Sequence, residues 1–316
     1  MDSFREGGSE EGPTDGPRAG GAGSGAAPLQ RARADGLGGP EGVAPNPAAG
    51  AGTSDGGLAG EAARLAKNWE LRARTPHRDF FVASHPGWDQ PAEWARQAEV
   101  DVQLFLHGLQ PDQLAGWQVL EIGCGVGRLV PSLAPRVAGY TGFDLAPGMV
   151  EVAEERNAGV ANARFCLSDG TGVPTAAQDR KYDLVLALAV FIHCPRAVIA
   201  ANLRSAYAQL APGGQLRFQL RADPSDPEGL QSMDLSAALH DEIVAQANAQ
   251  ASGHGTAEPA PAELTAEGEY MGDCFTFAEL PAWLRDAVGA PEAHVERIRF
   301  DLASHYGWLQ KPATET

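Results

Sequence analysis

Short apolar runs alternate with helix-like segments through the middle of the chain. Runs of strand length occupy residues 119–122, 139–143, 163–167, 182–188 and 215–220. Segments with helical character fill residues 127–134, 147–157 and 195–210, and the last two begin with proline. Alternating elements of this kind are typical of repeated βα units around a parallel sheet. Because residues 182–188 are nearly all apolar, this strand is expected near the centre of the sheet, covered on both faces.

Amphipathic helices are also predicted before the first strand. Apolar residues recur at helical spacing over residues 58–74, and a second helix is expected over 91–109, with Pro91 at its first position. The segment between them is an aromatic-rich loop. We interpret this N-terminal part as a candidate lid that contributes an apolar wall to a ligand pocket, although aromatic side chains commonly just fill a core. The aromatic residues considered for the wall are Trp69, Phe80, Phe81, Trp88, Trp94, Tyr270 and Phe275.

The part of the chain after residue 220 has a different pattern. Residues 221–273 form a long irregular insertion with a helix-like stretch at 235–249, and long segments of this kind are usually functional. A helix over 277–288 and strands over 295–302 and 305–309 are expected to follow.

Composition divides the chain sharply near residue 57. Residues 1–57 are dominated by Gly, Ala, Pro and acidic residues, so this segment is predicted to be a disordered tail. Residues 58–316 are expected to form one domain of catalytic size. Its expected parts are a helical lid at 58–110, a core at 117–220, an insertion or second lid at 221–275, and a final helix with a strand pair at 276–316.

Charge and cysteine usage narrow the classes of function. The chain of 316 residues has 24 Lys plus Arg against 41 Asp plus Glu, a net charge of −17 that disfavours nucleic acid as a partner. The longest apolar run, 184–192, is too short to span a membrane. The four cysteines, Cys124, Cys166, Cys194 and Cys274, include no Cys-x-x-Cys pair. A cytoplasmic protein without a bound metal is therefore expected, and its oligomeric state is left open.

A glycine-rich loop directly follows the first expected strand. Its spacing is Gly123-x-Gly125-x-Gly127, which allows close approach of the backbone to a ligand and leaves amide groups pointing at it. Arg128 occupies the place where the dinucleotide fingerprint needs a third small residue, which disfavours nicotinamide or flavin. Asp144 ends the second strand about twenty residues after the loop, the offset at which a carboxylate accepts ribose hydroxyls.

These motifs resemble those of the class I S-adenosylmethionine-dependent methyltransferases. The resemblance rests on residues 119–127 and 142–149 and continues with 168–170, 182–187 and 210–216, in the order of that family. It implies an α/β fold with a doubly wound, seven-stranded, mostly parallel Rossmann-like sheet in the order 3-2-1-4-5-7-6. The helical N-terminal lid and the insertion after the fifth strand would be additions to that sheet.

The resemblance also implies a cofactor site for S-adenosylmethionine. Glu121 and the loop from Gly123 to Gly127 would line its methionine and ribose parts, and Asp144 would bind the ribose hydroxyls. Asp169 would accept the adenine amino group between Leu145 and Met149, and the backbone of Ala187 would approach the ammonium group. The implied cofactor-binding residues are Glu121, Gly123, Cys124, Gly125, Gly127, Asp144, Leu145, Met149, Ser168, Asp169, Gly170 and Ala187. Asp144 and Asp169 also fit ordinary helix caps.

Methyl transfer from a sulfonium is an in-line displacement that needs alignment rather than a covalent catalyst. His193, just after the fourth strand, is the candidate general base, with packing or a backbone hydrogen bond as the alternative. His77, His85, Tyr270 and Asp273 are further candidates to orient an acceptor, or surface residues. Cys124, Cys166 and Cys194 fit either a thiol site or buried packing.

The expected function is methyl transfer from S-adenosylmethionine to an oxygen or nitrogen of a small-molecule acceptor. Two alternatives stay open. A regulator that binds S-adenosylmethionine without catalysis would keep the same loop. Aminopropyl transfer on the same fold would need an acidic cluster after the fourth strand, where this chain has residues 187–194 with no acidic side chain.

Overall fold

The computed structural model describes residues 57–83, 87–231, 272–299 and 304–313. Nearly all of the predicted tail, the helix-like stretch at 235–249, and the candidates His85 and Tyr270 lie outside these ranges. Among the described residues, no helix combines the length and the apolar character needed to cross a membrane.

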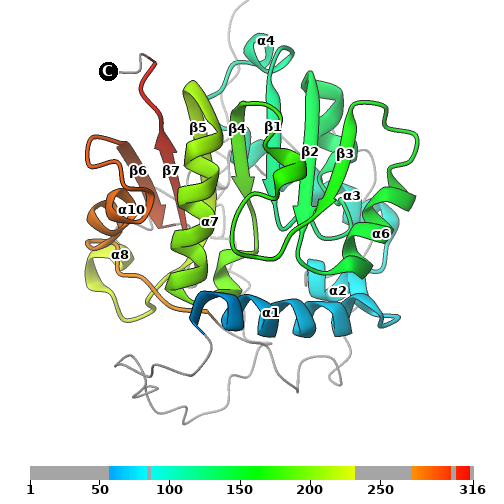
Figure 1. The fold of residues 1–316 in the computed structure, drawn as a ribbon, viewed down its shortest axis with the longest axis horizontal. Helices are drawn as coiled ribbons and strands as arrows, with labels where there is room; N and C mark the ends of the chain where they lie inside the picture. Colours follow the sequence, from blue (N-terminus) through cyan, green and yellow to red (C-terminus); the bar gives the residue numbers. More distant parts are fainter. Residues whose placement is uncertain (1–56, 84–86, 232–271, 300–303, 314–316) are drawn as a thin grey trace, which may run out of the picture. The chain divides into compact units, whose positions relative to one another are not determined.

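The described strands form one sheet of seven in the order β3-β2-β1-β4-β5-β7-β6 (Figure 1). The first five strands are parallel, whereas β7 is antiparallel to both β5 and β6. This order confirms the predicted fold class. The bounds are β1 Gln118–Ile122, β2 Gly139–Asp144, β3 Ala163–Leu167, β4 Tyr182–Ala187, β5 Leu210–Arg221, β6 His294–Arg299 and β7 Ser304–Gln310.

Helices connect and cover these strands. The α-helices are α1 Gly57–Ala73, α2 Arg78–Val82, α3 Pro91–Leu106, α4 Pro111–Leu114, α5 Val130–Leu133, α6 Pro147–Arg156, α7 Arg196–Gln209, α8 Pro227–Gln231 and α10 Leu280–Val288. Short 3-10 turns occur at η1 Ala134–Arg136, η2 Thr175–Ala177 and η3 Phe191–His193. The aromatic-rich segment predicted as a loop contains α2, which begins two residues after Pro76.

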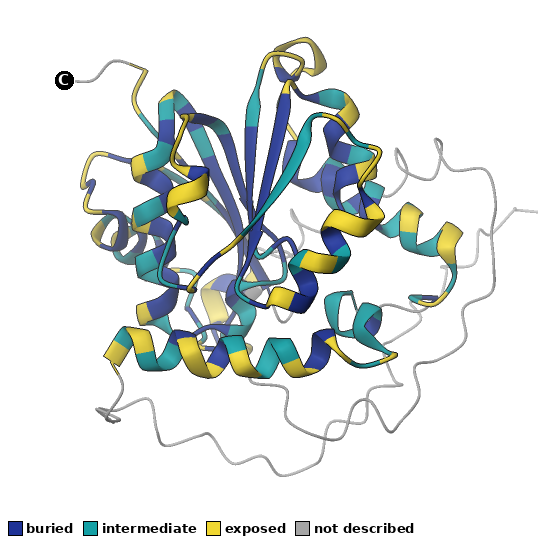
Figure 2. Ribbon diagram, turned by 45° about the vertical axis from the view of Figure 1, so that its right-hand side comes forward, coloured by how far each residue is buried: buried dark blue, intermediate teal, exposed yellow. Residues whose placement is uncertain are grey.

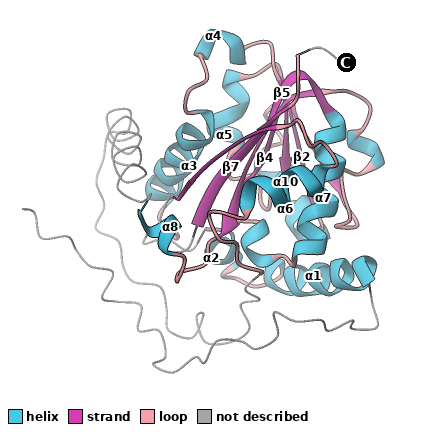
Figure 3. Ribbon diagram, turned by 90° about the vertical axis from the view of Figure 1, so that its left-hand side faces the viewer, coloured by secondary structure: helices cyan, strands magenta, loops and turns pink. Residues whose placement is uncertain are grey.

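Helices lie on both sides of the sheet (Figure 3), and a hydrophobic cluster fills the space on each side. Helices α7 and α10 pack against one face, which includes Leu120 and Val185, and α3 and α5 pack against the other, which includes Val119 and Leu184. Neighbouring residues of one strand thus point into opposite layers, and all four are completely buried. Figure 2 shows the central strands as buried along most of their length. This double burial explains why their sequences are almost continuously apolar.

The helix after β1 begins later in the sequence than predicted, because the glycine-rich loop precedes it. We predicted a helix from residue 127, but α5 begins only at Val130. Gly127 has φ +71°, in the left-handed region, so it cannot continue a right-handed helix. A Cβ atom at this position would lie 2.5 Å from Nδ2 of Asn157 and 3.3 Å from the Phe165 ring. The backbone therefore turns tightly here, and only glycine fits the space.

Replacing Gly127 with alanine tests this constraint. We expect Gly127→Ala to lower the free energy of unfolding by about 1–3 kcal/mol, because the left-handed backbone and the contact with Asn157 both penalise a methyl group. Chemical denaturation would measure the change. Gly159→Ala is the matched control, since a Cβ atom there meets nothing within 4 Å. Equal stability of the two variants would contradict the assigned loop geometry.

Candidate functional site

A cavity lies at the carboxyl ends of the parallel strands. Its empty volume is about 920 Å³, counting the space at its mouth. The segments that follow β1, β2, β3 and β4 all contribute side chains or backbone to it, and α1, α2 and α7 complete the walls. Open α/β sheets bind ligands at this edge.

The backbone after β1 lies close to the segment after β4. Gly123 has φ +65°, and a Cβ atom on it would lie 2.4 Å from Cγ2 of Val190. Both residues line the cavity. Ala189, next to Val190, also has a positive φ of 56°, which is unusual for a residue with a side chain. Its N–H donates to Oε1 of Gln219 at 3.0 Å, and this bond stabilises the turn.

Asp144 joins the glycine loop to the end of β2. Its Oδ2 accepts from the N–H of Gly125 at 3.0 Å, and its Oδ1 accepts from the N–H of Ala146 at 2.9 Å. The second bond closes a local turn before α6 and is not a helix cap, because Ala146 is the N-cap residue and no side chain caps this helix. Asp144 also lines the cavity. Burial raises the pKa of Asp144, although the bond from Ala146 opposes the shift.

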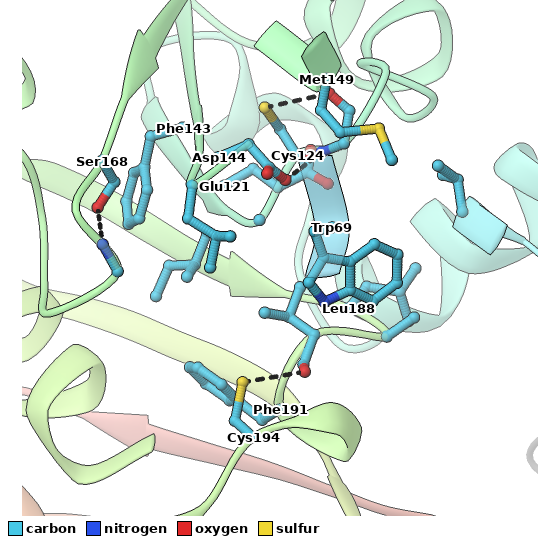
Figure 4. A pocket seen from close by; sticks show the side chains of 18 of the residues that line it. Trp69, Glu121, Cys124, Phe143, Asp144, Met149, Ser168, Leu188, Phe191 and Cys194 are labelled. Carbon is cyan, nitrogen blue, oxygen red and sulfur yellow. Dashed lines mark hydrogen bonds between the residues drawn. The ribbon is translucent and has the colours of Figure 1, made fainter. Parts of the chain in front are cut away.

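Glu121 is the second buried carboxylate of the cavity. It is 4% exposed, and its Oε2 accepts from the hydroxyl of Tyr140 at 2.6 Å. Burial raises the pKa of Glu121 to about 7, while the bond from Tyr140 and the nearby Arg128 charge oppose the rise. The carboxyl group therefore titrates close to neutral pH. Figure 4 shows Glu121, Cys124 and Asp144 in the same region of the cavity.

The cavity brings together most of the residues that the sequence indicated for a cofactor. Those that line it are Glu121, Gly123, Cys124, Gly125, Asp144, Leu145, Met149, Ser168 and Gly170. Gly127 and Ala187 are outside the lining. Asp169 is also outside, because it is exposed and its Oδ1 accepts from the N–H and the hydroxyl of Thr171 at 2.8 and 2.6 Å.

The N-terminal helices supply one apolar wall. Leu65 and Trp69 of α1 and Phe81 and Val82 of α2 line the cavity. Figure 1 shows α1 lying across the end of the sheet where the parallel strands finish. The other aromatic candidates have other places: Phe80 contacts Trp88, Trp94 packs beside Arg128, and Phe275 packs on Trp283 in the core.

Polar contacts attach α1 to α6. Oε2 of Glu70 accepts from the N–H of Gly148 at 2.7 Å, and Nη1 of Arg74 is 2.6 Å from Oε2 of Glu151. The side chains of Arg74 and Glu151 are 54% and 60% exposed. Salt therefore screens this ion pair strongly.

His193 lies next to the cavity wall rather than in it. Its ring packs edge-to-face against Trp69 with the ring centres 5.2 Å apart. Trp69 lines the cavity and His193 does not. The candidate base is therefore one side chain away from the enclosed space. Asp273, another candidate, accepts from the N–H of Arg196 at 2.7 Å, at the start of α7.

Sequence reasoning missed several residues of the cavity. These are Arg128 and Leu129, the turn after β4, and two residues four apart on α7, namely Val198 and Asn202. The regular spacing was visible in the sequence, but an apolar helix face usually packs against a core. Nothing local distinguishes a residue that faces a cavity from one that faces a sheet.

The cysteines near the cavity are unreactive in character. Cys124 and Cys194 are buried and line the cavity. Burial raises the pKa of Cys194 to about 12 and also raises that of Cys124. The described residues contain no group of three or more potential metal ligands. Buried packing is the interpretation that agrees with these surroundings.

The same region of the chain is similar to known methyltransferases. Residues 119–214 match the family described as methyltransferase domain. Two proteins named ubiquinone biosynthesis O-methyltransferase are related in sequence. The one from Pseudomonas savastanoi pv. phaseolicola is 28% identical over 143 residues, covering 44% of this chain and 59% of that protein. The one from Azorhizobium caulinodans is 38% identical over 101 residues, covering 32% and 39%. The matches thus span less than two thirds of these relatives.

A solved structure described as the DhpI-SAM-HEP complex has a similar fold. It is 20% identical, the alignment covers 82% of this chain and 99% of that one, and the TM-score is 0.50. This likeness concerns the fold alone. The strand order of the sheet and the matched segment lead to the same assignment. The chain has the Rossmann-like fold of the class I S-adenosylmethionine-dependent methyltransferases, and its residues 119–214 match the methyltransferase domain family.

Proposed function

We propose that the chain transfers a methyl group from S-adenosylmethionine to a small-molecule acceptor. The observation that carries this proposal is the enclosed cavity at the sheet edge, where the glycine loop and Asp144 meet. The cavity lies at the ends of four parallel strands, where open α/β sheets bind nucleoside ligands. The sequence match to a methyltransferase domain covers the same elements.

The residues of the cavity fit the parts of this donor. Asp144 is fixed by two backbone donors, and each of its oxygens keeps a lone pair for a ribose hydroxyl. Leu145 and Met149 offer apolar surface for a purine. The donor supplies a methyl group bound to a positively charged sulfur. Asp169 accepts from Thr171 through Oδ1 alone, so its Oδ2 is left to accept from a purine amino group beside Ser168, which lines the cavity.

The part of the cavity that remains for an acceptor has apolar walls. We infer an acceptor that carries a hydroxyl group on a flat or aliphatic body. Trp69, Phe81, Val82 and Leu188 provide large apolar surfaces at the cavity. The names of the two curated relatives specify methylation on oxygen, which supports oxygen rather than nitrogen. An apolar enclosure excludes water, and the aligned acceptor then needs only to lose its proton.

A regulator without catalysis stays the alternative function. Such a protein would bind the donor and its demethylated product but transfer no label. Incubation with donor labelled in the methyl group, small-molecule pools and the protein, followed by mass spectrometry, separates the two functions. Label in a product supports the enzyme, and tight binding without transfer across broad pools supports the regulator.

Removing the Asp144 carboxylate should remove donor binding. We expect Asp144→Ala to weaken S-adenosylmethionine binding by about a hundredfold or more, because ribose hydroxyls and the Gly125 N–H both lose their acceptor. Isothermal titration calorimetry measures this change. Asp112→Ala, on the exposed surface of α4, is the control and should leave affinity unchanged. Unaltered affinity in Asp144→Ala, with the fold intact, would remove Asp144 from the site.

Glu121 should make donor binding depend on pH. Its raised pKa of about 7 means that the empty cavity holds a neutral carboxyl group at pH 6 and a carboxylate at pH 8. A cationic donor favours the carboxylate, so affinity should rise roughly tenfold from pH 6 to pH 8. Calorimetry at several pH values measures the rise, and Glu121→Gln should flatten it.

Thermal unfolding of the ligand-free chain checks the ionisation of Glu121 independently. A pKa raised by folding stabilises the folded chain below the unfolded pKa, and that stability is lost as pH rises through the folded value near 7. Compared with Glu121→Gln, the wild type should therefore lose stability between pH 5 and pH 8. Parallel profiles for the two proteins would show that Glu121 does not titrate in this range.

His193 should act through Trp69. We expect His193→Gln to raise the KM for the acceptor severalfold and to change kcat little, because the ring supports the wall without lining the cavity. Steady-state kinetics with the identified acceptor measures both constants. A fall in kcat of about a hundredfold, with donor affinity preserved, would instead assign His193 as the general base.

A further inference from the structure

Leu188, Ala189 and Val190 form the turn between β4 and η3, and all three line the cavity. β4 ends at Ala187, whose partner on β5 is Phe218. Beyond this pair the chain leaves the sheet, and the backbone at Ala189 takes a φ of +56°. Residues with a side chain seldom adopt this conformation, and it persists only where neighbouring groups enforce it. The contacts that hold this turn therefore help to shape the cavity.

The side chain of Gln219 supplies a contact that favours this conformation. Gln219 follows Phe218 on β5, one residue beyond the last pair with β4, and its side chain reaches the turn. Its Oε1 accepts from the N–H of Ala189 at 3.0 Å, and its Nε2 donates to Oγ of Ser304 at 2.8 Å. Gln219 and Ser304 are 9% and 5% exposed. Because both ends of this buried amide are bonded, its orientation is fixed.

The turn carries this constraint to the glycine-rich loop. Val190 packs so closely on Gly123 that a Cβ atom on Gly123 would lie 2.4 Å from Cγ2 of Val190. The carbonyl of Val190 also accepts from the N–H of His193 at 3.1 Å, so the turn is attached to η3. If Ala189 relaxed to a negative φ, Val190 would lose this place against Gly123. Gln219 is not among the residues that line the cavity, so its effect on a ligand passes through the turn.

We propose that Gln219 is a positioning residue for the donor site, and this inference rests on the proposed function. By accepting from Ala189, Gln219 holds the turn in its strained form, and Val190 of the turn then supports the glycine-rich loop at Gly123. A packing role alone would make Gln219 important for stability, whatever residue stands at position 189. The two roles are separable, because glycine adopts a positive φ readily and alanine does not.

The test combines variants at positions 189 and 219 and measures the binding of S-adenosylhomocysteine to the full chain by calorimetry. Gln219→Leu removes the hydrogen-bond acceptor at similar side-chain volume. We expect this variant to weaken binding about tenfold, because the bond that favours the turn is lost. Ala189→Gly should allow the turn to form without Gln219. In the Ala189→Gly chain, Gln219→Leu should therefore weaken binding less than about threefold.

Two further variants keep the result interpretable. Gln215→Leu is the matched control, because Gln215 lies on the same strand and its Oε1 accepts from Nη2 of Arg217 at 2.7 Å, away from the residues that line the cavity. This control should leave the affinity unchanged. Gln219→Asn keeps an amide but is one methylene shorter, so it cannot bond both Ala189 and Ser304. It replaces Gln219→Leu if that variant folds poorly, and it should show the same loss and the same rescue by Ala189→Gly.

The outcomes separate this inference from the proposed function. If the wild type binds neither S-adenosylmethionine nor S-adenosylhomocysteine, the proposed function is wrong. If the wild type binds them and Gln219→Leu keeps full affinity with the fold intact, the donor site stands and the role of Gln219 is wrong. The role is also wrong if Gln219→Leu weakens binding by the same factor with alanine and with glycine at position 189.

Discussion

The site depends on one carboxylate that accepts two backbone hydrogen bonds. Asp144 receives the N–H of Gly125 from the loop after β1 and the N–H of Ala146 at the start of α6. These bonds fix the ends of two neighbouring strands relative to each other. Gly123 can then lie against Val190, and this contact positions the segment after β4 as well. The buried carboxylate thus has backbone groups as its hydrogen-bond partners.

The three charged side chains of the cavity are each held by a different kind of partner. Asp144 is held by amides, Glu121 is held by a phenol hydroxyl and titrates near pH 7, and Arg128 is held by Asp101 from outside the sheet. Burial makes each of these groups sensitive to the charge of a ligand. Glu121 titrates near pH 7, so a cationic ligand favours its carboxylate form on binding.

The sequence predicted the sheet well because its strands are buried on both faces. Double burial leaves a continuous apolar run, and the antiparallel last strand followed from the family resemblance. The glycine loop and Asp144 were also recognisable, since their spacing reflects local backbone geometry. Asp169 stays a prediction: it is not among the residues that line the cavity, and its Oδ1 accepts from Thr171 two residues later, a turn that the spacing of the motifs does not reveal.

Longer-range contacts could not be predicted for a different reason. The pair of Arg128 with Asp101 depends on how α3 packs against the turn before α5, and no local pattern records that packing. Val198 and Asn202 likewise look like an ordinary core-facing stripe of α7, yet they face the cavity. The short helix α2 was missed because five residues are too few to show helical periodicity.

The attachment of α1 to α6 gives the cavity two walls of unequal rigidity. The floor consists of strand ends locked by backbone hydrogen bonds, whereas the α1 wall is joined to α6 partly by an exposed ion pair that salt screens. Substitutions in α1 can therefore reshape the space for an acceptor without disturbing the strand ends beneath it. A domain built in this way can acquire new acceptors in evolution while the donor chemistry stays constant.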